Sequence, residues 1–104
     1  MPEPVFVVAT VVTGPEGIDE LAASFGRALP AVHAEDGCER YTVLRGGDRI
    51  VTVERWTSMQ AMEAHGRGEA IAEVVETATR LAIEPFDVQV LGGTSAGDPA
   101  KNTL

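Results

Sequence analysis

The chain has 104 residues, of which 44% are hydrophobic, and its formal net charge is −8. This length fits one domain with a modest core, and the acidic balance argues against nucleic acid or an anionic membrane as a partner, because binding phosphates requires clustered Lys and Arg. The single cysteine, Cys38, excludes an internal disulfide and a cysteine-based metal site, and the apolar run near the N-terminus is too short to span a bilayer, so we expect a cytoplasmic protein.

The first expected elements are a strand and a helix. Residues Val5–Val12 form a nearly unbroken β-branched run, which is typical of a central strand buried on both faces. From Ile18 to Val32 the apolar residues recur at helical spacing, and this predicts an amphipathic helix that Pro30 interrupts near its end.

The middle of the chain predicts a β-hairpin followed by a short helix. Two strands, about Glu39–Arg45 and Arg49–Trp56, are joined by a short glycine turn. Thr57 followed by Gln60 forms a capping-box pattern, which predicts a helix that begins there and ends near Gly66.

The last elements complete a ferredoxin-like order. Apolar residues between Ile71 and Ala82 predict another helix, and residues 86–90 alternate as in a strand with one wet face at a sheet edge. The order β-α-β-β-α-β predicts an α+β fold with a four-stranded antiparallel sheet and helices on one face. We therefore expect a domain at residues 1–92 and a tail at residues 93–104 that is either a flexible end or an arm packed on a partner subunit.

The first strand also predicts a homodimer. Thr10 is the only polar residue in Val5–Val12, so the sheet face opposite the helices should be apolar and need a cover. A second copy of the sheet is the most economical cover, since two-fold interfaces are the commonest. A local loop or the C-terminal tail is the alternative.

A small set of residues carries the candidate chemistry. Alternation along the third strand places Glu54 and Trp56 on one face, and helical spacing places His65 on the apolar side of its helix. His33 lies at the margin of the first helix's apolar stripe, so both histidines are expected to face the space between helices and sheet. An imidazole beside a carboxylate such as Glu54 suits a general base.

Structural roles also explain these residues. Trp56 suits a core anchor, and Tyr41 suits either a ligand contact or an interface. His33 and His65 each lie near a helix C-terminus, where they would interact with the helix dipole. Cys38 has no nearby activating base and is predicted to be a small buried residue. The helical spacing of Met59 and Met62 predicts that both lie in the core. The chain carries no nucleotide-binding, zinc-protease or serine-hydrolase motif, and we expect neither a metal nor a cofactor.

Three segments, "AEDGCERYTVLR", "VTVERWTSMQAMEAH" and "FDVQVL", together resemble the antibiotic biosynthesis monooxygenase family over about Val5 to Leu91. The resemblance implies a dimeric α+β barrel that oxygenates an electron-rich aromatic with O2 and without flavin, haem or metal. Some members have an Asn four residues before the tryptophan, where this chain has Thr52. The haem-degrading branch has an Asn on the first strand, where Ala9 and Thr10 stand here, and this difference argues against haem degradation.

Two functions remain open from the sequence. In the first, the protein is a monooxygenase for a quinol, anthrone or related polyphenol, with His65 or His33 as the base beside Glu54, and with Trp56, Tyr41 and Thr52 around the substrate ring. In the second, it is an isomerase or small-ligand-binding barrel that uses the same pocket without oxygen chemistry. A third hypothesis is an interaction protein with no small-molecule role, and it would be favoured if the pocket were too small or too polar for an aromatic ring.

Overall fold

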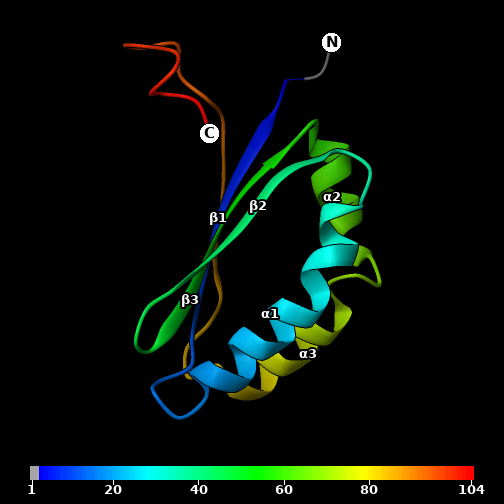
Figure 1. Cartoon of the computed structure of the whole chain (residues 1–104), viewed down its shortest axis with the longest axis vertical. Coiled ribbons are helices and arrows are strands. Elements are labelled where there is room, and N and C mark those ends of the chain that lie inside the picture. Colours follow the sequence, from blue (N-terminus) through cyan, green and yellow to red (C-terminus); the bar gives the residue numbers. More distant parts are fainter. Residues whose placement is uncertain (1–2) are drawn as a thin grey trace.

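The computed structural model describes residues 3–104 as one sheet covered by helices on one side (Figure 1). The elements in chain order are β1 (Val5–Val12), α1 (Ile18–His33), β2 (Cys38–Arg45), β3 (Arg49–Trp56), α2 (Met59–Arg67), α3 (Ala72–Leu81) and β4 (Asp87–Leu91). All neighbouring strands are antiparallel, and their order across the sheet is β2-β3-β1-β4. The predicted ferredoxin-like α+β fold is confirmed. Within residues 3–104, none of the helices combines the length and hydrophobicity that a bilayer span requires.

The two faces of β1 have different surroundings. Val7 belongs to the face that packs on the helices and is 3% exposed, whereas Phe6, Val8 and Thr10 on the outer face are half-buried. The prediction that both faces are buried is wrong for the single chain, because the three helices all cover the same face. The outer face is therefore left partly open to solvent.

The helix α1 forms from the predicted amphipathic stripe and continues further than expected. Its buried side carries Ile18, Leu21, Phe25, Ala28 and Val32. The predicted interruption at Pro30 is wrong, since α1 runs through it to His33. Pro30 lies in the last turn, where it removes one backbone hydrogen bond, and the Ala34 N–H closes the helix by donating to the Pro30 carbonyl over 3.3 Å.

A glycine between α1 and β2 brings this part of the chain against α2. Gly37 has φ +84°, and a Cβ placed on it would lie 2.5 Å from Cβ of Ala61. Only glycine fits both the left-handed backbone and this close approach. The hydrogen bond from the Thr57 N–H to the Gly37 carbonyl, 2.9 Å long, fixes the same contact.

The start of α2 differs in detail from the sequence prediction. Ser58, rather than Thr57, is the N-cap, and its hydroxyl accepts a hydrogen bond from the Ala61 N–H at 3.1 Å. Met59 follows the cap and is 46% exposed, so its assignment to the core is wrong, whereas Met62 packs against the core as expected.

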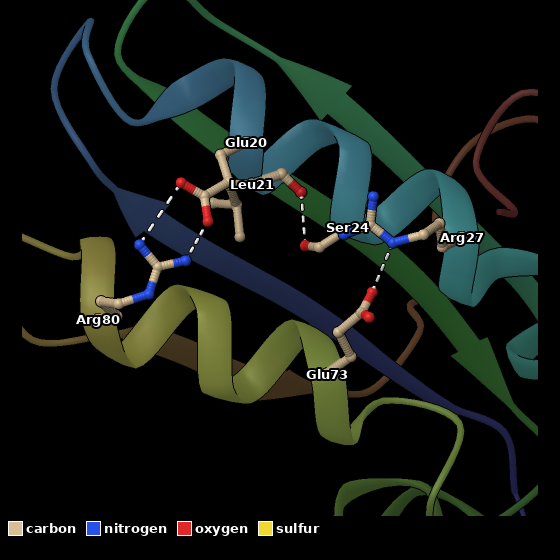
Figure 2. Close-up of polar contacts among 6 residues, drawn as sticks. All are labelled: Glu20, Leu21, Ser24, Arg27, Glu73 and Arg80. Carbon is tan, nitrogen blue, oxygen red and sulfur yellow. Dashed lines mark hydrogen bonds and ion pairs between the residues drawn. The ribbon is translucent and has the colours of Figure 1, made fainter.

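The helices α1 and α3 lie side by side above the sheet (Figures 1 and 2). Two ion pairs join them, one between Glu20 and Arg80 and one between Arg27 Nε and Glu73 Oε1 at 2.8 Å. All four side chains are more than half exposed, so solvent screens both pairs and they contribute little to stability. The packing of α1 and α3 on the sheet is stabilised mainly by burial of their apolar sides.

The edge strand β4 is followed by an irregular C-terminal tail. β4 is an edge strand as predicted, but both of its faces are exposed, because the helices do not extend over it. Residues 92–104 form no regular element and are exposed. The end of the tail borders a hollow with Phe6 and Val8 on the outer face, and Arg55 Nη1 donates to the Leu104 carbonyl over 2.9 Å.

Candidate active site

A cavity of about 210 Å³ lies between the inner face of the sheet and the helices. Its floor comes from β1 and β3, and its roof comes mainly from α2 and α3. Four polar side chains line it, namely Tyr41, Thr52, Glu54 and His65, and the other lining residues are apolar or glycine. Such a cavity, mostly apolar with a few converging polar groups, is typical of a small-molecule site.

Glu54 is held rigidly in the cavity wall by two neutral donors. The Thr52 hydroxyl donates to Oε2 over 2.7 Å, and the Trp56 indole N–H donates to Oε1 over 2.9 Å. All three residues point to the same side of β3 because side chains alternate along a strand. Glu54 is only 5% exposed, so these bonds replace much of its lost hydration. A carboxylate has room for about four hydrogen bonds, so Glu54 can still accept one from a ligand.

His65 is oriented by a second carboxylate, that of Glu35. The distance from His65 Nδ1 to Glu35 Oε1 is 2.6 Å, and the imidazole is 8% exposed. In the neutral ring Nδ1–H donates to the carboxylate, which leaves Nε2 without its proton and able to accept one from a ligand. A base held by an acidic partner in this way resembles the arrangement that orients many catalytic histidines.

Trp56, Tyr41 and His65 form an aromatic cluster at one end of the cavity. The ring centroids of Trp56 and His65 are 4.6 Å apart with their planes 33° apart, and those of Tyr41 and His65 are 5.3 Å apart. Trp56 is 0% exposed and does not line the cavity. Trp56 therefore lies behind the cavity wall, where it packs against His65 and donates to Glu54, and its expected contact with a substrate ring stays a prediction.

Two other groups near the site stay protonated. Burial, followed by the charge of Glu54, raises the pKa of the Tyr41 phenol above its ordinary range, so Tyr41 is a hydrogen-bond donor at neutral pH. Burial, followed by the charges of Glu35 and Glu54, also raises the pKa of the Cys38 thiol. Cys38 is half-buried rather than buried as expected, and its raised pKa favours the neutral thiol at neutral pH.

Comparison with known proteins shows the family. A sequence model described as antibiotic biosynthesis monooxygenase matches residues 4–77, which is more than half of the chain. The chain belongs to the antibiotic biosynthesis monooxygenase family. A search of curated proteins finds no significant match.

Solved structures share the fold of this antibiotic biosynthesis monooxygenase family member. Rv0793 from Mycobacterium tuberculosis is 26% identical with a TM-score of 0.82, and the alignment covers 92% of this chain and 100% of that one. A conserved protein from Methanosarcina mazei Go1 is 17% identical with a TM-score of 0.80, over 86% and 92% of the two chains. A structure described as an antibiotic biosynthesis monooxygenase is 18% identical with a TM-score of 0.80, over 86% and 98%.

In this family member the two histidines occupy different surroundings. His65 lines the cavity, as expected from its helical spacing. His33 is exposed at the end of α1 and forms a 2.9 Å hydrogen bond between its Nε2 and the Tyr41 carbonyl. The expectation that His33 also faces the space between helices and sheet is wrong, because the last turn of α1 extends beyond the cavity.

Glu35, and not the expected Glu54, is the carboxylate hydrogen-bonded to His65, and the sequence pattern did not predict it. The partner of His65 is 30 positions away in the chain, so no helical or strand period relates the two. The available signal is the acidic turn "AEDGC", in which Gly37 forces the backbone against α2. Among residues 3–104, no group of three or more His, Cys, Asp or Glu side chains is arranged to hold a metal ion.

Proposed function

We propose that this protein is a cofactor-independent monooxygenase that oxidises a quinol or related phenol with O2. The observation that carries the proposal is the environment of His65. Glu35 engages one ring nitrogen, and the other is left for a ligand in an apolar cavity that also contains Glu54, Thr52 and Tyr41. An apolar, partly closed site favours this chemistry because it keeps water away from the reactive intermediates.

The reaction begins with proton transfer to His65. Nε2 accepts the proton of a substrate hydroxyl, and the resulting phenolate is electron-rich enough to reduce O2 directly. One oxygen atom forms a bond to a ring carbon, and the other leaves as water. For a hydroquinone the products are a hydroxyquinone and water, so the four electrons that O2 accepts all come from the substrate.

The remaining polar groups position the substrate. The free lone pairs of Glu54 accept a hydrogen bond from a second hydroxyl of the substrate, and this interaction raises the electron density of the ring. Tyr41, which keeps its proton, donates to an oxygen of the substrate. Thr52 holds the Glu54 carboxylate in place for this contact.

The size of the cavity favours a small ring. Pockets for drug-sized ligands generally measure roughly 300–1,000 Å³. The cavity here, at about 210 Å³, suits a one-ring quinol better than a three-ring anthrone. We therefore place the one-ring quinols first among the candidate substrates.

We also propose that the protein acts as a homodimer whose copies meet through the outer face of the sheet. Phe6 and Val8 are half-buried on this face, and Leu44 and Leu91, in register on the same face, are 51% and 45% exposed. A contiguous exposed apolar face commonly marks a protein interface, and two-fold dimers are the commonest oligomers.

A second candidate function uses the same cavity without oxygen chemistry. His65 and Glu54 both line the cavity, and two proton carriers in one site can move a proton between two substrate carbons. This observation favours an isomerase or a small-ligand-binding protein as the alternative.

Oxygen consumption separates the two functions. Purified protein, expected to be colourless, should accelerate O2 uptake with hydroquinone or methylhydroquinone in the presence of a metal chelator and without added flavin. One O2 should disappear per substrate, and one atom of isotopically labelled O2 should enter the product. If a broad quinol panel binds but shows neither uptake nor label above the buffer rate, the isomerase or binding function replaces the monooxygenase.

A further inference from the structure

The polar and apolar parts of the cavity are separated across the sheet. Its polar side chains all come from β2, β3 and α2, whereas the parts contributed by β1, α3 and β4 are apolar. Thr52, Ala9 and Val88 are direct cross-strand neighbours, so they form one row from β3 through β1 to β4. The floor of the cavity therefore changes from polar to apolar along this row.

The apolar end of the cavity opens to solvent through hydrophobic side chains. Val75, Phe86 and Val88 line the cavity and are nevertheless 44%, 41% and 56% exposed. We call these three residues the apolar rim. Ala9, which also lines the cavity, lies between Thr52 and Val88 in this row, and its small side chain occupies little of the space between the polar end and the rim.

We propose that the substrate is a phenolic ring that carries an apolar substituent, which leaves the cavity over Ala9 and binds to the apolar rim. This inference rests on the proposed function for the ring end of the ligand. The ring hydroxyls meet Glu54, Tyr41 and His65, and the substituent covers side chains that would otherwise expose apolar surface to water. Two strand spacings, about 10 Å in all, separate the Thr52 position from Val88, which leaves room for a short alkyl chain beyond the ring.

Other covers for the rim fit the structure less well. The tail borders Phe6 and Val8, which lie on the outer face, so it is on the opposite side of the sheet from the rim. The proposed dimer interface is also on the outer face and leaves the inner face of β4 free. A ligand that continues out of the cavity is the occupant that the position of the rim favours.

Chain-length dependence of binding tests the inference directly. Each buried methylene contributes about 0.8 kcal/mol, or roughly a fourfold change in affinity, so para-butylphenol should bind at least about tenfold more tightly than phenol. Calorimetry under anaerobic conditions measures this ratio without any turnover. In oxygen-uptake assays, kcat/KM should likewise be higher for butylhydroquinone than for hydroquinone.

Two matched variants identify the binding surface. Val88→Asp should remove most of the chain-length gain. Val90→Asp should keep it, because Val90 points to the same face of the same strand, is 43% exposed and does not line the cavity. Val88→Thr is the milder change and should reduce the gain partially. Both positions are exposed, so the variants should fold.

The outcomes separate this inference from the proposed function. Equal affinity for phenol and para-butylphenol, or the same effect of Val88→Asp and Val90→Asp, overturns the apolar-substituent proposal even if hydroquinone is oxidised. A chain-length gain that depends on Val88 supports it even if no O2 is consumed. If Val88→Asp changes the mass in solution and leaves the binding ratio unchanged, the rim is a protein interface and the proposal fails.

Discussion

Replacing Glu35 by Gln tests whether this carboxylate orients the base. The change keeps the size of the side chain but removes the negative charge that accepts the His65 Nδ1–H at 2.6 Å. The Gln amide can also present an N–H to Nδ1, which favours the ring tautomer with its proton on Nε2 and blocks proton acceptance there.

The size of the effect follows from the hydrogen bond. Bonds to charged groups contribute about 1.5–3 kcal/mol, which corresponds to roughly a tenfold to hundredfold change in the population of the active tautomer. Glu35 is partly exposed, with 21% of its side chain accessible, so solvent screening places the expected loss of kcat nearer to tenfold. Glu35 positions the base and does not line the cavity, so KM should change little.

The assay is steady-state oxygen uptake with hydroquinone, with thermal unfolding as a check of the fold. Asp36→Asn is the matched control, because it removes one charge from the neighbouring exposed side chain, whereas the hydrogen bond to His65 comes from Glu35. An equal kcat for the Glu35→Gln and Asp36→Asn variants would refute the positioning role. A loss seen only in KM would contradict it as well.

Three further predictions concern ionisation, stability and assembly. Since burial raises the pKa of Tyr41, the only tyrosine, tyrosinate absorbance should not develop at pH 10 in the folded protein, and ionisation of Tyr41 in the folded protein near pH 10 would contradict this. The contribution of Tyr41 to stability should be constant below about pH 10 and should fall above it by up to about 1.4 kcal/mol per pH unit, because only the unfolded chain then loses the proton. Trp56→Phe should lower the free energy of unfolding, measured in urea, by about 2–4 kcal/mol, since it leaves a void and removes a hydrogen-bond donor from Glu54. A loss below about 1 kcal/mol would show that the packing of Trp56 contributes little to stability. Light scattering should report about twice the 11.0 kDa chain mass for the parent protein. Val8→Asp on the outer face should give a folded monomer, whereas Val7→Asp on the inner face should unfold the chain. A dimeric Val8→Asp variant would exclude the proposed interface.

The sequence predicted the elements well because their periods are local properties. The β-branched run of β1, the helical stripe of α1 and the alternation in β3 each depend on neighbours a few residues apart. The same alternation correctly placed Glu54 and Trp56 on one face. The predicted break of α1 at Pro30 was wrong because the rule that proline interrupts a helix depends on position. Pro30 lies in the last turn of α1, where few intrahelical hydrogen bonds remain to be lost.

The partners within the site were less predictable because tertiary packing selects them. Glu35 reaches His65 only after Gly37 brings the start of β2 against α2. Glu54, the carboxylate nearer to His65 in sequence, instead bonds to side chains of its own strand. The exposure of His33 depends on how far α1 extends past the cavity, which the helical period alone does not determine.

The role of His65 is tested most directly by measuring oxygen uptake of the His65→Ala and His33→Ala variants with hydroquinone as substrate. His33 is the matched control, since it is the only other histidine and lies on the surface outside the cavity. If His65 is the general base, kcat should fall by about 10²-fold or more for His65→Ala and should stay near the parent value for His33→Ala. Full oxygen uptake by folded His65→Ala protein would contradict the assignment of His65 as the base.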